Sequence, residues 1–369
     1  MKLSGLKVLD LSLFLPGPML TLMMADHGAD VIKIEPWEEG DPARHIGYRK
    51  NGHSVWFRNA NRGKRALRLN LKTDADKARF MALAAEADVI VEAFRPGVAD
   101  RLGVGYDAIA AINPGVVYVS VSAFGQTGPN RDRPAHDLAV EALAGVVALN
   151  EGQDGKPAMP HMPVADALAS LTALSGVLMA LLRRKDTGRG DFLDVAMFDS
   201  LVAWTPNVTG RIFATGQPHV VKDERSFGGN AMYNLYETAD GQWITLGGAE
   251  PKFARNLLAG LGREDLVVYA TLPPGPEQEP LRVFLREAFR QKTRAAWEAW
   301  FEGRDVCFAP VRDLKQAFED PHLVARGMLA HDAEGSEIVG TPLIFRLEPG
   351  APDPTVPAVN DETIGWRAR

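Results

Sequence analysis

Short apolar segments alternate with amphipathic helical segments through the first 200 residues, and this alternation restricts the fold more than any other feature. Strands that are separated by helices pair in parallel, because the helix carries the chain back to the same edge of the sheet. The sequence therefore predicts an α/β fold in which a parallel sheet carries helices on both faces. The expected strands are residues 7–12, 30–35, 88–94 and 116–124, and the expected helices are 19–28, 74–87 and 104–113.

The pattern changes after Asp199. Residues 231–248 alternate around Asp240-Gly241, which predicts a β-hairpin, and the segments 250–262 and 282–303 have helical amphipathicity. We therefore expect a smaller α+β domain in the second half of the chain. The predicted division is a large Rossmann-like domain at 1–199 and 311–369, a linker at 200–224, and the small domain at 225–310.

The first βα turn lacks the glycine pattern of a dinucleotide site. A turn that binds a pyrophosphate carries G-x-G-x-x-G, whereas this chain has LFLPGPMLTLMMADHG at 13–28, and Pro18 removes a backbone donor. We therefore expect no NAD. The sequence also contains no P-loop, no H-E-x-x-H or C-x-x-C metal motif and no G-x-S-x-G nucleophile elbow, so we expect no bound metal.

Charge and cysteine content restrict the possible partners. The formal net charge is -6 and the calculated pI is about 5.8, which argues against nucleic-acid binding. The single cysteine, Cys307, excludes an intrachain disulfide and fits a reducing cytoplasm, where we place the protein. The N-terminal residues do not have the apolar run of a signal peptide. Residues 167–182 are the longest apolar stretch but are interrupted by Ser and Thr, so we expect no membrane span.

Five stretches in the first 200 residues carry a resemblance to a known family. They are GLKVLDLSLFLPGPMLTLMMADHGADVIKIEP, NRGKRALRLNLKT, DVIVEAFRPGVADRLGVGYDAI, NPGVVYVSVSAFGQTGP and LLRRKDTGRGDFLDVAMFDS. With these, the chain resembles the class III CoA-transferase (CaiB/BaiF-type) family, which also contains the α-methylacyl-CoA racemases. YETADGQWITLGGAEPKF and FEGRDVCFAPV in the second half are most similar to the racemase branch. The resemblance implies acyl-CoA substrates and an interlocked homodimer.

Coenzyme A carries a 3′-phosphate and a pyrophosphate, so basic side chains are needed to bind it. The basic candidates are the stretch RGKR at 62–65, which contains Arg62, Lys64 and Arg65, together with Lys72, Arg95 and Arg101. The resemblance places Leu69, Lys72, Phe94 and Arg101 at positions that touch CoA in the family. One family contact, the residue after VIKIE, is often arginine but is Pro36 here, so we expect that contact to be lost or moved, for example to Arg44.

Three further residues are candidates for catalysis. By resemblance, Asp166 matches the catalytic aspartate of the family, His136 matches the acid/base histidine of the racemases, and Glu250 matches a carboxylate that orients this histidine. Each also has a purely structural interpretation. Asp166 precedes a long apolar segment and suits a helix N-cap, His136 suits a packed histidine, and Glu250 precedes Pro251 at a helix start.

Two chemistries fit these residues, and we favour the first. In the epimerisation of a 2-methylacyl-CoA, His136 and Asp166 exchange a proton on opposite faces of the α-carbon, and backbone N–H groups at the start of the 167–182 helix stabilise the enolate oxygen. In the alternative, a CoA transfer to a carboxylic acid, Asp166 attacks the thioester and forms an acyl anhydride. The joint presence of His136 and Glu250 favours the racemase, whereas ADALASL after Val164 is closer to transferases. A non-catalytic acyl-CoA-binding protein is the third possibility.

Overall fold

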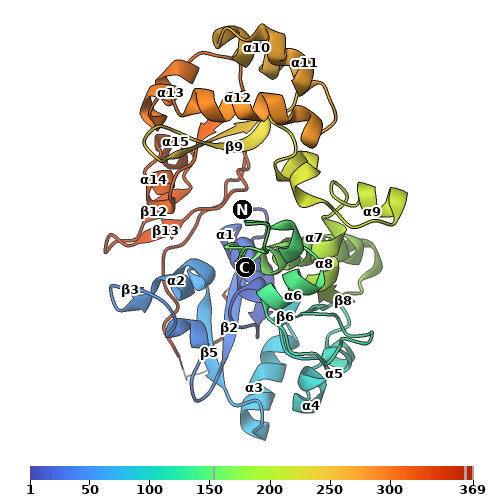
Figure 1. Cartoon of the computed structure of the whole chain (residues 1–369). Coiled ribbons are helices and arrows are strands. Elements are labelled where there is room, and N and C mark those ends of the chain that lie inside the picture. Colours follow the sequence, from blue (N-terminus) through green and yellow to red (C-terminus); the bar gives the residue numbers. More distant parts are fainter. Residues whose placement is uncertain (153, 361–363, 368–369) are drawn as a thin grey trace. The chain divides into compact units, whose positions relative to one another are not determined.

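The computed structural model describes residues 1–152, 154–360 and 364–367 (Figure 1). Contacts between Cα atoms divide the chain into two compact units, and we describe each by itself. Unit 1 comprises Met1–Val146, Pro160–Thr205 and Asp320–Arg369, and unit 2 comprises Val147–Met159 and Pro206–Glu319. The segment Val147–Met159, which the sequence analysis assigned to the first domain, therefore groups with the second unit, in which Gly155 lies beside the Lys222 ammonium group.

Unit 1 contains a six-stranded sheet in which all neighbouring strands are parallel, as the sequence predicted. The spatial order is β5-β2-β1-β6-β7-β8. Two of these strands were not expected from the sequence. They are the two edge strands, β5 and β8, and both carry charged residues that interrupt the apolar pattern. The strands are β1 (Lys7–Asp10), β2 (Asp30–Pro36), β5 (Arg65–Leu69), β6 (Val89–Glu92), β7 (Val117–Ser122) and β8 (Asp191–Ala196).

Successive residues of each central strand point to opposite faces of the sheet, and each face has its own apolar core. In β1, Val8 belongs to one core and Leu9 to the other. The core on the Val8 side is closed by α1, α6, α7 and α8, and the core on the Leu9 side is closed by α3, α4 and α5 (Figure 1). The helices of the sheet domain are α1 (Pro16–Asp26), α2 (Val55–Asn61), α3 (Asp74–Ala84), α4 (Val98–Leu102), α5 (Tyr106–Ile112), α6 (Asp137–Leu143), α7 (Val164–Thr187), α8 (Met197–Ala203) and α15 (Pro321–Ala325).

Unit 1 also contains two small antiparallel pairs of strands. They are β3 (Arg49–Lys50) with β4 (His53–Ser54), and β12 (Leu329–His331) with β13 (Glu337–Val339). The side chain of Asn51 donates hydrogen bonds to Glu334 O and to Ser336 Oγ at 3.1 and 2.8 Å, which joins the C-terminal segment to the N-terminal half of the unit.

Unit 2 contains the predicted hairpin. β9 (Tyr233–Glu237) pairs antiparallel with β10 (Trp243–Gly247), and the Gly241 N–H donates to Thr238 O in the turn. The predicted helix at 282–303 is two helices instead of one, because Thr293 caps a new helix by accepting a hydrogen bond from the Ala296 N–H. The remaining elements are β11 (Phe308–Pro310), α9 (Gly210–Thr215), α10 (Pro251–Gly260), α11 (Val267–Ala270), α12 (Glu279–Phe289), α13 (Arg294–Phe301) and α14 (Leu314–Phe318).

Helix α7 is long and apolar enough to cross a membrane by length and composition. One side of it is part of the apolar core of unit 1, where Ala169, Ala173 and Val177 are buried. The core role of this side accounts for its apolar composition. The other side exposes Leu178, Met179 and Leu182, at 42%, 68% and 67% of their surface.

The strand order reverses between β1 and β6, which are neighbours in the sheet although β2 and β5 intervene in the sequence. In open parallel sheets, ligands bind beyond the carboxyl ends of the strands at such a switch point. The segments that follow these two strands are Leu11–Leu15 and Ala93–Gly97. The fold therefore predicts a binding site between these two loops.

Candidate functional site

A cavity of about 710 Å³ lies at this switch point. Leu13 and Phe14 line it from the loop after β1, and Phe94 and Arg95 from the loop after β6. His136 and Asp166 also line it, so the fold places the two predicted catalytic residues at the same cavity although they are 30 positions apart. The remaining lining residues come from the same two loops, from the first residue of α1, from β7 and the segment after it, and from α6 and α8.

Asp166 is the third residue of α7 and does not cap it. The helix begins at Val164, and its N-cap residue is Pro163, which has no side-chain cap hydrogen bond. The N-cap interpretation of Asp166 is therefore wrong, because the N-cap lies three positions earlier, at Pro163. The apolar pattern predicted a helix that begins at residue 167, whereas the helix begins at Val164. Burial and the neighbouring carboxylates of Asp137 and Glu141 raise the pKa of Asp166 to about 7.

The first turn of α7 receives its caps from α6 instead. The Val164 N–H donates to Glu141 Oε1 at 3.1 Å, and the Asp166 N–H donates to Asp137 Oδ1 at 3.0 Å. The prediction that N–H groups at this helix start hold a reacting oxygen is therefore wrong for these two donors, because carboxylates of the protein already occupy them.

His136 is the N-cap residue of α6, is exposed, and makes no side-chain cap hydrogen bond. Its ring packs edge-on against Phe14, with the ring centroids 5.9 Å apart and an interplanar angle of 83°. Phe14 itself has a φ of 64°, in the left-handed region that bulky residues rarely adopt. Unfavourable backbone geometry of this kind persists only where the surrounding structure enforces it.

A buried ionic network enforces the conformation of the loop that carries Phe14. Lys33 Nζ donates to Ser12 O at 2.7 Å, and Lys64 Nζ donates to Pro18 O at 2.9 Å. Lys64 also pairs with Asp10, and both side chains are completely buried. Gly17 completes the packing, since a Cβ atom there would lie 2.2 Å from the Ser12 side chain.

Lys64 and Arg65 were predicted to bind CoA phosphates, but the structure gives both side chains other partners. Burial, opposed in part by the Asp10 carboxylate, lowers the pKa of Lys64 to about 8, and its ammonium group donates to Asp10, Pro18 and Asn61. Arg65 Nη2 donates to both carboxylate oxygens of Asp30, at 2.8 and 2.6 Å. Arg62, in the same RGKR stretch, is also buried and pairs with Asp26. For Arg62 and Lys64 this corrects the prediction, because a cationic group enclosed by the fold does not reach a phosphate in solvent.

Leu69, Lys72 and Phe94, which the resemblance assigned to CoA, line one cavity of about 280 Å³. Leu11, Leu13 and Trp37 contribute further apolar surface to the same cavity. Leu13 and Phe94 line both this cavity and the larger one that contains Asp166. A ligand that occupies the smaller cavity therefore has a neighbouring space that leads to Asp166.

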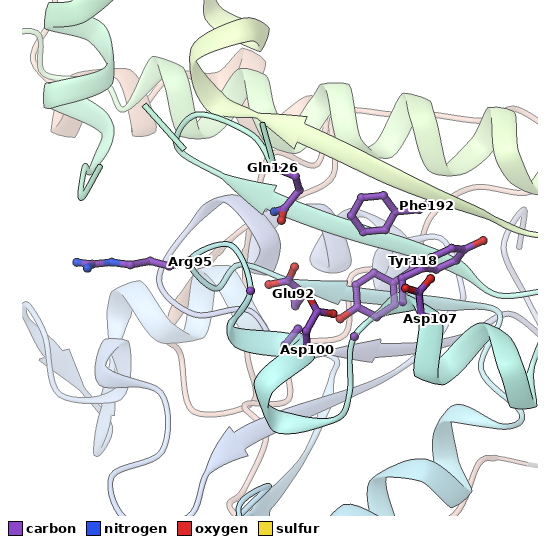
Figure 2. Close-up of a pocket in the computed structure, with 11 residues that line it drawn as sticks. Glu92, Arg95, Asp100, Asp107, Tyr118, Gln126 and Phe192 are labelled. Carbon is purple, nitrogen blue, oxygen red and sulfur yellow. The ribbon is translucent and has the colours of Figure 1, made fainter. Parts of the chain in front are cut away.

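The predicted arginines lie around the loop after β6. Arg95 lines the Asp166 cavity, and Figure 2 shows its side chain extending away from Glu92 and Asp100, with which it shares a second pocket of about 230 Å³. Arg101 Nη1 and Arg131 Nη2 lie 3.4 and 3.6 Å from the position that a Cβ atom of Gly97 would take. These guanidinium groups form a cationic border on the site.

The predicted replacement of the lost arginine contact by Arg44 meets a competing interaction. Arg44 donates to both carboxylate oxygens of Glu35 and to the Pro357 carbonyl oxygen. These contacts orient Arg44 toward the C-terminal segment.

Glu250 belongs to unit 2, where it is the exposed N-cap residue of α10 and makes no side-chain cap hydrogen bond. The structural interpretation of Glu250 as a residue at a helix start is therefore confirmed. Its role in orienting His136 stays a prediction.

Two groups of site residues were missed from the sequence. Arg131 and Arg133 line the Asp166 cavity, and their signal was a basic pair directly before the candidate His136. Glu141 was missed as well, although Asp137 and Glu141 are one helical turn apart and both precede an aspartate of interest. Among the residues that the structure describes, no group of three or more His, Cys, Asp or Glu side chains is placed to hold a metal ion.

Comparisons with known proteins show which family the chain belongs to. The chain is 31% identical to a succinyl-CoA–D-citramalate CoA-transferase of Chloroflexus aurantiacus, over 97% of this chain and 91% of the relative. It is 32% identical to an acetyl-CoA:oxalate CoA-transferase of Acetobacter aceti, over 94% and 92% of the two chains. The crystal structure of a CaiB/BaiF family protein from Brucella suis superposes with a TM-score of 0.85 at 29% identity, covering 97% of this chain and 96% of that chain. A family model described as CoA-transferase family III matches residues 3–363, and the chain belongs to this family.

Proposed function

We propose that this enzyme transfers CoA from an acyl-CoA to a carboxylic acid, with Asp166 as the nucleophile. The observation that carries the proposal is the position of Asp166 at the switch-point cavity, next to the cavity lined by Leu69, Lys72 and Phe94. The names of the relatives support a transferase over the racemase that the sequence favoured.

The environment of Asp166 suits a nucleophile. Burial, Asp137 and Glu141 raise its pKa to about 7, so near neutral pH a large share of the group is ionised. A carboxylate with a raised pKa is more basic, and hence more nucleophilic, than an ordinary aspartate. Among the described residues no side chain or backbone N–H donates to its carboxylate oxygens, so the lone pairs remain available for attack.

The proposed reaction has four balanced steps. The Asp166 carboxylate attacks the thioester carbonyl, which releases the CoA thiolate and forms a mixed anhydride. The thiolate then attacks the aspartyl carbonyl, which releases the donor acid and leaves CoA as a thioester on Asp166. The acceptor carboxylate displaces CoA in the same way and forms a second anhydride. The thiolate finally attacks the acyl carbonyl of the acceptor, which yields the new acyl-CoA and restores the Asp166 carboxylate.

We further propose that the acceptor is a short dicarboxylic acid. Arg95, Arg131 and Arg133 line the cavity, and a guanidinium group binds a carboxylate by charge-assisted hydrogen bonds. One carboxylate of the acceptor reacts at Asp166, and the second is then held by an arginine. The substrates in the names of the two relatives, citramalate and oxalate, are acids of this class.

The proposed assembly is a homodimer. The outer side of α7 exposes Leu178, Met179 and Leu182. Leu314 at the start of α14 and Leu347 in the C-terminal segment are also exposed, at 77% and 87%. A contiguous apolar helix face of this kind is rarely left in contact with water, and a second copy of the chain is the partner that we expect to cover it.

The racemase is retained as the second candidate because His136 lines the same cavity as Asp166. Two acid/base groups at one cavity are the arrangement that proton exchange at an α-carbon requires. The racemase requires His136 as an acid/base group, whereas the proposed CoA transfer does not use it.

The test combines two isotope measurements on the whole protein. The first measurement uses unlabelled succinyl-CoA and an acceptor dicarboxylate labelled with ¹⁸O. The proposed steps transfer one labelled oxygen from the acceptor to the Asp166 carboxylate and, in a later turnover, from Asp166 to the released donor acid. Mass spectrometry of the Asp166 peptide and of the donor acid measures this transfer. In D2O without an acceptor, a transferase leaves the α-carbon of the acyl group unlabelled. Deuterium at the α-carbon that disappears in His136→Ala, without any ¹⁸O transfer, supports the racemase and rejects our proposal.

A further inference from the structure

Glu141 is a buried acid that the proposed reaction does not use. It lies on α6, its side chain is 0% exposed, and Oε1 accepts the hydrogen bond from the Val164 N–H. Oε2 is also buried and has no hydrogen-bond partner among the described residues. An ionised carboxylate with a buried, unpartnered oxygen is unfavourable, so this position requires either a donor or a proton.

Asp137 supplies the other half of the arrangement. It precedes Glu141 by one helical turn, and the two carboxyl groups are within hydrogen-bonding reach of each other. Asp137 Oδ1 already accepts the hydrogen bond from the Asp166 N–H. Neither carboxylate can donate to the other when both are ionised, whereas one proton on Glu141 satisfies both groups and leaves the pair with a single negative charge.

We propose that Glu141 is a positioning residue for Asp166: as a neutral acid it donates a hydrogen bond to Asp137, and the pair holds the first turn of α7 by the N–H groups of Val164 and Asp166. This inference rests on the proposed function of Asp166 as a nucleophile.

The basicity of the Asp166 carboxylate depends on which groups accept hydrogen bonds from the N–H groups in the first turn of α7. An aspartate in the first helical turn ordinarily gains from the free N–H groups and the positive end of the helix dipole, both of which stabilise its ionised form. Here α6 takes two of these N–H groups. The Asp166 carboxylate is therefore left without donors next to a negative charge, and it stays basic. Burial also raises the pKa of Glu141, in line with a neutral acid at that position.

The charged groups around Asp166 come from several elements. The acidic neighbours, Asp137 and Glu141, come from α6. The basic groups line the cavity: Arg131 and Arg133 come from the segment before α6, and Arg95 comes from the loop after β6. His136 caps α6, and the first turn of α8 carries Asp199, which is exposed. The end of α1 that contacts α7 contributes the Pro16 carbonyl oxygen, which accepts from Ser170 Oγ, and no charged group.

The test compares two substitutions of Glu141 in the full-length protein by the pH profile of kcat/KM for CoA transfer from succinyl-CoA. Glu141→Gln keeps the acceptor for Val164 and the donor for Asp137, so we expect kcat within about threefold of wild type and the pH midpoint within about half a unit. Glu141→Leu removes both. Its kcat should fall about tenfold or more, with little change in KM, and its midpoint should fall by about one unit as N–H groups turn to the Asp166 carboxylate. Glu287→Leu, at an exposed position of α12, is the matched control and should change neither quantity.

Each outcome decides the matter. If Glu141→Leu keeps the wild-type kcat and midpoint, or if Glu141→Gln is as impaired as Glu141→Leu, Glu141 does not act as a neutral positioning acid. If Glu141→Leu does not fold, the midpoint of Glu141→Gln alone decides, and a fall of more than about one unit rejects the inference. Asp166→Asn is measured in parallel: an active Asp166→Asn rejects the proposed function, whereas an inactive one with a normal Glu141→Leu rejects only the role of Glu141.

Discussion

Asp137 Oδ1 accepts a hydrogen bond from the backbone N–H of Asp166 at 3.0 Å, so the first turn of one helix caps the first turn of the next. The residue after the exposed His136 is thereby tied to the backbone of the predicted nucleophile. This bond places a negative charge beside Asp166 and removes an N–H donor from its surroundings. Together with burial, which is the largest cause of the raised pKa, both effects favour the protonated form of Asp166.

The rate of CoA transfer should rise with pH and level off above about 7. Burial and the negative charge of the Asp137–Glu141 pair raise the pKa of Asp166 to about 7, and only the ionised carboxylate attacks the thioester. Below that value kcat/KM should fall about tenfold per pH unit. Initial rates with a saturating acceptor between pH 5 and 9 measure this profile. A bell-shaped profile with a second, falling limb near neutral pH contradicts the single-nucleophile mechanism and favours acid/base chemistry with His136.

Asp166→Asn should greatly reduce turnover and stabilise the fold at alkaline pH. Because the pKa of Asp166 is raised on folding from 3.8 to about 7, ionisation destabilises the folded state as pH rises from about 4 to about 7. Asn removes that penalty. We expect the free energy of unfolding to increase by on the order of 2 kcal/mol at pH 8, after allowance for partial exposure, and by little at pH 4.

Chemical denaturation at both pH values measures the stability change, and the transfer assay should show a loss of about 10²-fold or more in rate. Asp74→Asn is the control, because Asp74 is an exposed aspartate in the first turn of α3. A gain in stability that is equal at pH 4 and pH 8 shows that the ionisation of Asp166 is not its cause.

Substitution of Lys64 should lower the stability of the fold, whereas substitution of Arg101 should lower the affinity for CoA. Lys64→Met breaks the fully buried pair with Asp10, and we expect a loss of about 3 kcal/mol in the free energy of unfolding. Arg101→Glu changes an exposed residue beside Arg131, so the fold should keep its stability while the affinity for CoA falls about tenfold or more. Thermal melts and calorimetric titration with CoA separate the two effects. Normal CoA affinity in Arg101→Glu removes this residue from the site.

The protein should sediment as a dimer, at twice the chain mass of 40.1 kDa, at micromolar concentration. We expect a dimer because the apolar side of α7 is exposed in the single chain. The double substitution Met179→Glu and Leu182→Glu places charged groups on this side, and charged groups resist burial. It should therefore weaken the association or prevent folded protein from accumulating. Asp186→Lys, near the exposed end of the same helix, is the control. A single-chain mass for the wild-type protein shows that the α7 face is not covered by a second copy.

Much of unit 1 was predictable because its signal is local. The apolar runs at 30–35 and 116–124 became β2 and β7 with almost the predicted bounds, since central strands of a parallel sheet are buried on both faces and read as continuous apolar segments. The edge strands β5 and β8 were missed for the same reason. Arg65, Arg68, Asp191 and Asp194 interrupt their apolar pattern, which is tolerated where one side of a strand has no neighbour.

Some residues of the candidate site could be predicted from the sequence, and others could not. Asp166 and His136 were found through their resemblance to a family, and the fold places both at one cavity. Lys64 was assigned to phosphate binding because an isolated stretch of basic residues does not reveal which of them is enclosed. Glu141 was missed because nothing in the local sequence indicates that α6 runs against the start of α7.

The sequence by itself determined the alternation of strands and helices and the parallel sheet, because these depend on periodicity and on short connections. Only the tertiary structure decided the electrostatic state of the site. It buried Lys64 against Asp10, gathered Asp137, Glu141 and Asp166, and directed two N–H groups of α7 to α6. The pKa of a carboxylate depends on its distance to other charges and on the water around it, and both are fixed only when distant segments of the chain pack together.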